Sequence, residues 1–261
     1  MWPIKLIALF LVILALTICL VFVSSRRDSS YYDLLSRVIA PVSVLFLPSQ
    51  QPDPVPITES FNNSEIDKSW KWYKPELVTS RFDGGGLIVD TITESVWFNN
   101  VRGPMLYRYF DGDGEISVTV KTRKSSDRSS YPDTQWQFGG IIFRDPAGDA
   151  WFTKENYVFN VIGFRQKGSQ IETKSTSDGN SNVSGFNWDS GDAELLIQRH
   201  GATFTLKARP VGHDVWQDMV EYVRADLPPL LQVGIIVYSY SYGKNIYDLS
   251  VEFDNLALRS L

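Results

Sequence analysis

The chain has little of the residues that metal and nucleophilic catalysis need. Among its 261 residues are one cysteine, Cys19, and two histidines, His200 and His213. A zinc cluster or a disulfide framework needs more cysteines or histidines than this. A Ser-His-Asp arrangement would have to use one of two histidines that lie apart in the sequence, His200 in a turn. We therefore expect no catalytic residue of these classes.

Basic charge and helical periodicity are also scarce. The net charge is −5 and the pI is about 5.1. No run of Lys or Arg alternates with aromatic residues as nucleic-acid binding requires, so no nucleic-acid partner is expected. No stretch of the folded part shows the apolar spacing of an amphipathic helix.

One long apolar run is present, from Leu6 to Val23. At about 1.5 Å per residue it almost spans a bilayer core, and it is longer than the apolar region of about 7 to 15 residues in a cleaved signal peptide. We therefore expect residues 1–27 to form an uncleaved signal-anchor, one N-terminal transmembrane helix of a single-pass membrane protein. Small residues after Val23 leave cleavage open, and basic residues on both flanks leave the orientation open.

Residues 28–58 are expected to connect this anchor to a folded domain. Their apolar part is interrupted by Arg37 and Pro41 and is too short to span, so it would lie along the membrane interface or pack on the domain. The stretch from Pro48 to Thr58 is rich in proline and predicts an extended spacer. The folded domain is then residues 59–261.

Short alternating runs punctuated by turn residues fill this domain. They lie at 84–90, 114–122, 137–145, 156–164, 170–176, 194–199, 202–209, 230–240 and 249–259. Such spacing predicts an all-β fold, a two-sheet antiparallel β-sandwich or jelly roll. Gly139 and Gly140 remove two side chains from one predicted strand, which indicates close packing of a neighbouring strand more than room for a ligand.

The face of the 137–145 strand that carries Phe138 and Arg144 is the candidate groove, because side chains alternate along a strand. Asn160 is expected on the same face of the next strand. The candidate ligand-binding residues are Trp97, Trp136, Phe138, Arg144, Asn160, Glu172, Lys174, Trp188, Gln232 and Tyr238. The alternative is structural: Arg144 would pair with Glu172, and the tryptophans would cap the sandwich.

Carboxylates offer two further candidate sites. Glu65-Ile66-Asp67 is similar to the start of a Glu-x-Asp-x-x-Glu glucanase strand, but Trp70 stands where the second Glu is required. Asp111, Asp113 and Glu115 supply the oxygen ligands that calcium takes, yet the further spaced acids of an EF-hand are missing. A hairpin turn is therefore favoured there over a calcium site, and no other cofactor is expected.

Several short segments together resemble a known superfamily. They are Ile66–Trp72, Gly86-Leu87, Val96-Trp97, Gly103–Tyr107, Gly114–Ile116, Gly140–Asp145, Glu155–Tyr157 and Glu172–Lys174. Residues 59–259 are in this respect similar to the concanavalin A-like lectin/glucanase superfamily, and within it to the family of unknown function DUF1349, itself similar to the C-terminal sandwich of some β-xylosidases. The resemblance implies a jelly roll and a carbohydrate ligand, and it carries over no catalytic residue.

Three functions remain open. The favoured one is a membrane-anchored, non-catalytic carbohydrate-binding or adhesive domain, placed outside the cytoplasm because its glycan ligands are found there. The second is a glycoside hydrolase of the same superfamily with an unrecognised carboxylate pair. The third is a structural or protein-binding sandwich whose aromatic residues form the core.

Overall fold

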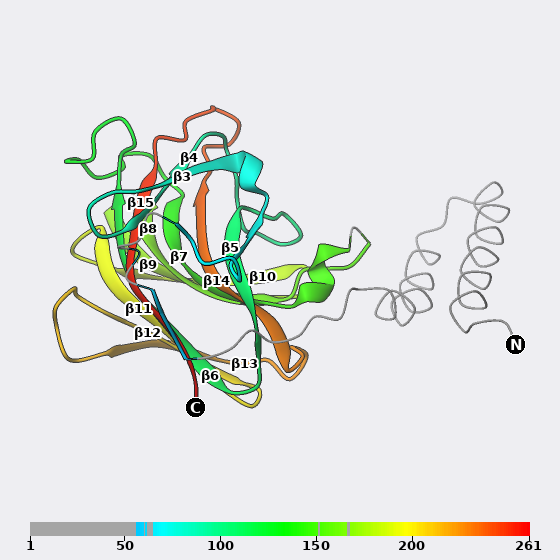
Figure 1. Cartoon of the computed structure of the whole chain (residues 1–261). Helices are drawn as coiled ribbons and strands as arrows, with labels where there is room; N and C mark the ends of the chain where they lie inside the picture. The colour runs from blue at the N-terminus through cyan, green and yellow to red at the C-terminus, as the bar shows by residue number, and fades with distance from the viewer. Residues whose placement is uncertain (1–55, 60, 62–64, 151, 166–167) are drawn as a thin grey trace, which may run out of the picture. The chain divides into compact units, whose positions relative to one another are not determined.

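The computed structural model describes residues 56–59, 61, 65–150, 152–165 and 168–261. Within these ranges the regular structure is β-strand, apart from two short 3-10 helices, η1 (Pro75–Leu77) and η2 (Pro146–Asp149). The strands form two antiparallel sheets that lie face to face (Figure 1). The expectation of an all-β, two-sheet sandwich is thereby confirmed.

The first sheet has eight strands among the described residues. They are β1 (Ile57–Glu59), β3 (Val78–Phe82), β4 (Leu87–Thr91), β6 (Gly114–Arg123), β11 (Asp192–His200), β12 (Thr203–Arg209), β13 (Gln217–Val223) and β15 (Ser250–Ser260). Their order is β13-β12-β11-β6-β15-β4-β3, and β1 pairs with β15 beside this path. The first and last strands of the described chain are therefore neighbours.

The second sheet has seven strands in the same part of the chain. They are β2 (Lys71–Tyr73), β5 (Met105–Asp111), β7 (Gln137–Arg144), β8 (Tyr157–Arg165), β9 (Gly168–Ser177), β10 (Asn180–Asn187) and β14 (Leu230–Ser239). Their order is β10-β9-β8-β7-β14-β5-β2, which places β7 at the centre.

The core between the sheets follows from alternation along the strands. Ile141 and Phe143 of β7 point into it, and Phe143 meets Phe204 of the facing sheet with ring centroids 5.6 Å apart. Phe138 and Ile142 point the other way and belong to a second buried cluster on the outer face of the seven-stranded sheet. Because both faces are covered, every residue of β7 is buried, which accounts for its nearly continuous apolar sequence.

At the paired glycines of β7, the facing sheet and the adjacent strand both come close to the β7 backbone. A Cβ at Gly139 would lie 2.5 Å from Val251 Cγ1 of the facing sheet. A Cβ at Gly140 would lie 2.2 Å from the backbone oxygen of Asn160 on the adjacent strand. The close packing expected from the sequence is confirmed, and neither glycine opens a space for a ligand.

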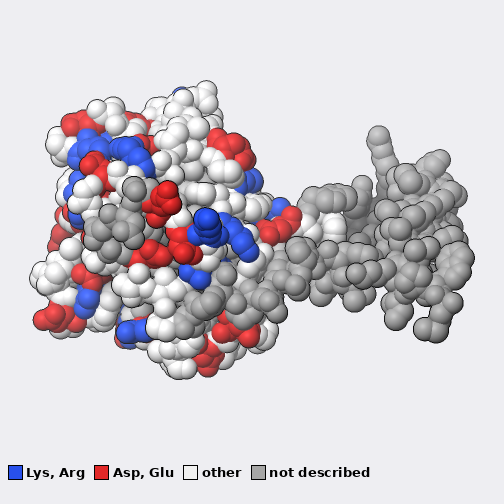
Figure 2. Space-filling view, viewed as in Figure 1, with Lys and Arg blue, Asp and Glu red and all other residues white. Residues whose placement is uncertain are grey.

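The surface of the sandwich mixes charges of both signs. On the face seen in Figure 2, Lys and Arg side chains lie among Asp and Glu side chains. Arg128, for example, forms ion pairs of 2.9 Å with Asp83 and 2.8 Å with Glu252. Surface pairs of this kind contribute little stability individually.

Two expectations fall on residues outside the described ranges. The apolar run from Leu6 to Val23 and the connecting segment 28–55 are among them. Within the described ranges, no helix has the length and apolar character to cross a membrane.

Candidate ligand-binding site

The outer face of the seven-stranded sheet, turned away from its partner sheet, carries a layer of aromatic side chains. Its buried members are Trp97, Met105, Tyr107, Tyr109, Phe138, Ile142, Tyr157, Phe159, Val161, Ile236 and Tyr238. Tyr238 of β14 stacks on its cross-strand neighbour Phe138 of β7 with ring centroids 5.4 Å apart, and along β8 Tyr157 stacks on Phe159 at 5.8 Å. Such stacking of large rings gives the face a rigid apolar floor.

A pocket of about 540 Å³ opens on this face, which is a volume typical of small-molecule sites. We call it the outer-face pocket. It is lined by Val96, Phe98, Val101, Trp136, Arg165, Lys174, Val183, Tyr238, Tyr240 and Tyr242. Strands β8, β9, β10 and β14 supply part of this lining, and the segments 96–101 and 240–242 and the residue before β7 supply the rest.

Two aromatic residues of the wall have backbones that are unusual for their size. Trp136 has φ 64° and Tyr242 has φ 57°, in the left-handed region that bulky residues rarely adopt. The loop of Tyr242 is held by Glu94, whose carboxylate accepts hydrogen bonds of 3.0 Å from Gly243 N and 2.9 Å from Asn245 N. Strain that the surrounding structure enforces in this way is common at ligand sites.

Lys174 brings a buried positive charge to the pocket. Its Nζ donates a 2.5 Å hydrogen bond to the backbone oxygen of Trp97 and lies 3.4 Å from Glu172 Oε1. The ammonium also sits 4.5 Å from the centre of the Phe159 ring. Burial lowers the pKa of Lys174 to about 8, and Glu172 opposes this shift. The amine therefore still carries most of its charge at neutral pH.

Glu172 is fully buried beside Lys174, and only one of its two carboxylate oxygens accepts a hydrogen bond from a described residue. Its Oε1 accepts a 2.9 Å hydrogen bond from the Tyr238 hydroxyl, while Oε2 has no hydrogen-bond partner among the described residues. The nearest cation to Oε2 is Arg165, whose NH1 is 3.9 Å away. Arg165 lies over the Trp136 ring at 3.9 Å, and the buried indole Nε1 of Trp136 also lacks a described partner. One acceptor and one donor at the pocket thus remain unpaired.

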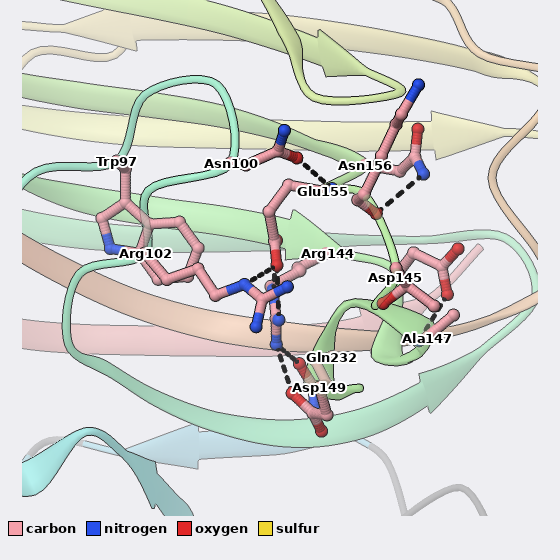
Figure 3. A network of polar contacts seen from close by, with 12 residues as sticks. Trp97, Asn100, Arg102, Arg144, Asp145, Ala147, Asp149, Glu155, Asn156 and Gln232 are labelled. Carbon is pink, nitrogen blue, oxygen red and sulfur yellow. Dashed lines mark hydrogen bonds and ion pairs between the residues drawn. The ribbon is translucent and has the colours of Figure 1, made fainter. Parts of the chain in front are cut away.

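Arg144 lies elsewhere on the outer face, inside a closed network of charges (Figure 3). It donates to both carboxylate oxygens of Glu155, at 2.8 and 2.9 Å, and to Asp149 at 2.6 Å. Gln232 accepts a 2.6 Å hydrogen bond from Arg144 and donates one of 2.8 Å to Asp149. Arg102 pairs with Glu155 from the other side.

This network is structural. Burial alone would lower the pKa of Arg144, but the hydrogen bonds and charge of Glu155 raise it, so the guanidinium stays charged. Arg144 and Gln232 are fully buried, and neither lines the outer-face pocket. The alternative pairing of Arg144 with Glu172 is wrong, because Arg144 takes Glu155 and Asp149 as its partners.

The expected placement of Asn160 is wrong as well. Asn160 pairs in register with Ile141, whose side chain faces the core, so Asn160 points between the sheets instead of outward. Its amide donates hydrogen bonds of 2.8 Å to the oxygen of Lys207 and 3.3 Å to that of Leu196. The residue of β8 opposite Arg144 is Tyr157, which does lie on the outer face.

The other predicted ligand-binding residues are divided between three places. Trp136, Lys174 and Tyr238 line the outer-face pocket, with Phe138 and Glu172 in contact with that lining. Trp97 is completely buried beside it. Trp188 lies apart, in a second hollow of about 580 Å³ that Tyr131 and Phe164 also line.

The candidate calcium ligands are not brought together. Asp111 ends β5 of the seven-stranded sheet and Glu115 lies in β6 of the eight-stranded sheet, so the segment is a turn that connects the two sheets, with Gly112 at φ 82°. The expected hairpin is therefore wrong, because β5 and β6 do not pair with each other. Asp113 accepts a hydrogen bond from Gly201 N, and Glu115 pairs with Arg259. Within the described residues, no group of three or more His, Cys, Asp or Glu could hold a metal.

Sequence reasoning missed several residues of the pocket. Arg165 could have been found from the sequence, because alternation along β8 places its side chain on the same face as those of Phe159 and Val161. Tyr240 and Tyr242 could also have been found, since they continue the every-second-residue pattern of Tyr238 past the end of β14. Phe98 and Val101 could not, because they lie in a segment without regular alternation.

Comparison with known proteins gives information about the fold. No protein-family model and no curated protein matches the chain. A functionally unknown protein from Saccharomyces cerevisiae is similar in structure, with a TM-score of 0.60 and 15% identity over 74% of this chain and 97% of that one. The matches extend to proteins with known sugar chemistry.

A xylan β-1,4-xylosidase from Bacillus halodurans is similar with a TM-score of 0.61 and 14% identity, over 82% of this chain and 41% of the xylosidase. Lectin II from Ulex europaeus is similar with a TM-score of 0.51 and 9% identity, over 80% of this chain and all (100%) of the lectin. The chain has the sandwich fold of lectins and glycoside hydrolases. At these identities the likeness concerns the fold alone, and it agrees with the resemblance to the concanavalin A-like superfamily.

Proposed function

We propose that this chain is a non-catalytic carbohydrate-binding protein whose ligand occupies the outer-face pocket. The observation that carries the proposal is the combination in one pocket of aromatic walls with unpaired polar atoms. Trp136, Tyr240 and Tyr242 offer ring faces on which a sugar can stack. The Trp136 indole N–H in the lining and the Glu172 Oε2 directly behind the lining are a donor and an acceptor with no partner among the described residues, and a sugar hydroxyl would supply one.

Hydrolysis is the less favoured function because it needs two carboxyl groups about 5 to 9.5 Å apart across the scissile bond. Glu172 adjoins the pocket, but it is held by Tyr238 and Lys174. The described residues that line the pocket include neither Asp nor Glu. A carbohydrate-binding sandwich of the DUF1349 type fits this arrangement better than an enzyme does.

We place this domain at a membrane. The support is the apolar run from Leu6 to Val23, which lies outside the described residues, and the proline-rich spacer that follows it. A glycan-binding domain would meet its ligands on the outer side of that membrane. Protease protection of the domain in intact cells would contradict this orientation.

The test is a glycan array probed with the full-length protein in detergent. Trp136→Ala and Tyr240→Ala each remove a ring of the outer-face pocket, and we expect each to weaken binding by about 1 to 3 kcal/mol, as for loss of an aromatic anchor. Tyr131→Ala is the matched control, because Tyr131 is an exposed aromatic residue of the second hollow.

The outcomes separate the alternatives. Loss of binding in the Tyr131 variant alone would move the site to the second hollow. An array on which the parent protein binds no glycan would favour the structural or protein-binding function. Release of reducing sugar from a polysaccharide would favour the hydrolase.

A further inference from the structure

The outer-face pocket carries an excess of positive charge. Arg165 and Lys174 line it, and none of its described lining residues is acidic. Glu172 behind the lining neutralises one of the two cations, since its carboxylate lies 3.4 Å from Lys174 and 3.9 Å from Arg165. One positive charge is left without a counter-ion among these three groups.

This charge lies in surroundings that strengthen its effect. The Lys174 side chain is 3% exposed and is enclosed by the rings of Phe98, Phe159 and Tyr238. Charges interact more strongly where water is excluded, so an anion that enters the pocket would be attracted more than at an open surface. A positively charged ligand would be repelled for the same reason.

Arg165 is the group best placed to select the anion. Its guanidinium lies over the Trp136 ring at 3.9 Å, and its side chain is 34% exposed. A stacked guanidinium keeps its N–H donors in the plane of the group, at its edge. Its ion-pair partner Glu172 lies at 3.9 Å, too far for a hydrogen bond. The Arg165 donors can therefore take a planar, two-oxygen acceptor, which is the geometry of a carboxylate.

We propose that the outer-face pocket selects acidic sugars, in which a uronic acid carboxylate binds Arg165 and Lys174 while the sugar ring stacks on the aromatic wall. This inference rests on the proposed carbohydrate-binding function and adds the chemical class of the ligand. The unpaired Glu172 Oε2 then accepts a hydroxyl of the same sugar.

The experiment compares each acidic glycan with its own neutral form. Uronate-containing oligosaccharides are titrated by calorimetry into the full-length protein, before and after chemical reduction of the carboxyl group to an alcohol. The acidic form should bind about tenfold tighter or more, the effect of a hydrogen bond to a charged group. Arg165→Gln should abolish that preference, and the distant surface variant Arg81→Gln should keep it.

A pH series provides a second readout that does not depend on a variant folding. Lys174 faces Glu172, Arg165 and the Tyr238 hydroxyl, and its charge is lost as the pH rises above about 8. The preference for the acidic form should therefore shrink between pH 8 and 10 in the parent protein. In Lys174→Met the remaining preference should not change over this range.

Each outcome has one meaning. Equal binding of acidic and reduced glycans would overturn the selection of acidic sugars and leave the carbohydrate-binding function standing. Binding of neither form, on a panel that also includes neutral glycans, would overturn both. Binding of sulfated but not uronate sugars would overturn the assignment of a planar carboxylate.

Discussion

Lys174 and Glu172 point to the same outer face of β9 and meet as a buried ion pair, with 3.4 Å between Nζ and Oε1. Both side chains are almost fully excluded from water, so each depends on the other and on the groups around them. The pair leaves one oxygen of the Glu172 carboxylate without a hydrogen-bond partner among the described residues. This is unusual for a buried charge and is expected where a ligand supplies the missing hydrogen bond.

The first prediction concerns stability and pH. The pKa of Lys174 is about 8 in the folded protein against an ordinary value of 10.5. Between these values the unfolded chain holds a proton that the folded protein has lost, so the free energy of unfolding rises with pH across this window. The total gain is about 3 kcal/mol at most. Denaturant unfolding at pH 7.5, 9 and 10 measures it.

The reference for this measurement is the double variant Lys174→Met/Glu172→Gln, which removes both charges of the pair together. Its stability should lack the rise that the parent shows between pH 8 and 10. Parallel curves for the two proteins would mean that Lys174 titrates normally.

The second prediction concerns the Arg144 network. Arg144→Ala leaves the buried Glu155 and the partly exposed Asp149 with fewer partners, and we expect a loss of about 3 to 5 kcal/mol, the usual effect of breaking a buried pair. Thermal unfolding measures the loss. Arg81→Ala removes a surface pair with Asp90 and should change stability by less than about 1 kcal/mol. Similar melting temperatures for both variants would contradict the structural role.

The third prediction concerns the close approach of strands at Gly140. A Cβ there would meet the backbone of Asn160 and Val161, which cannot move without breaking the sheet. Gly140→Ala should therefore cost about 2 kcal/mol or more. Gly185→Ala on the edge strand β10 is the control, because its Cβ would meet the ends of two flexible side chains, Gln170 at 3.1 Å and Arg165 at 3.7 Å, and no backbone atom within 4 Å is among its nearest neighbours. Equal effects would show that the sheet can adjust at Gly140.

The fourth prediction separates binding from stability at Tyr242. This residue is 60% exposed and has φ 57°, a conformation that glycine adopts without strain. Tyr242→Gly should leave the melting temperature unchanged or raise it slightly, while glycan affinity falls. A variant that melts much earlier would show that the ring stabilises the fold instead of serving the pocket.

The central strands were predicted well because turn residues bound each of their apolar runs, even though both faces of β7 are buried. The sequence did not predict β10, which is mostly polar and partly exposed at a sheet edge, or β2, which has only three residues. It also missed β5, where Met105 to Phe110 are all buried and no alternation remains. Edge strands and strands covered on both faces lack the period-two signal.

The candidate site was predictable where it lies on strands. Alternation correctly placed Glu172, Lys174 and Tyr238 on the outer face, but the pairing of strands was needed to place Asn160. The positions of the loops over the outer face depend on contacts between residues far apart in the sequence, such as the hydrogen bond from Lys174 to the Trp97 carbonyl. No local sequence pattern predicts such a contact. The partners of Arg144 were not foreseen because Asp149 and Glu155 lie in the segment between β7 and β8, which has no regular alternation.

The inward turn of Asn160 has a mechanical consequence. The hydrophobic effect has no direction, whereas a hydrogen bond has a preferred length and angle. The amide of Asn160 crosses this layer from β8 and ties it to the carbonyls of Leu196 on β11 and Lys207 on β12. These bonds favour one alignment of β8 over β11 and β12, and the 3.0 Å contact between the Thr173 and Tyr222 hydroxyls does the same for β9 over β13.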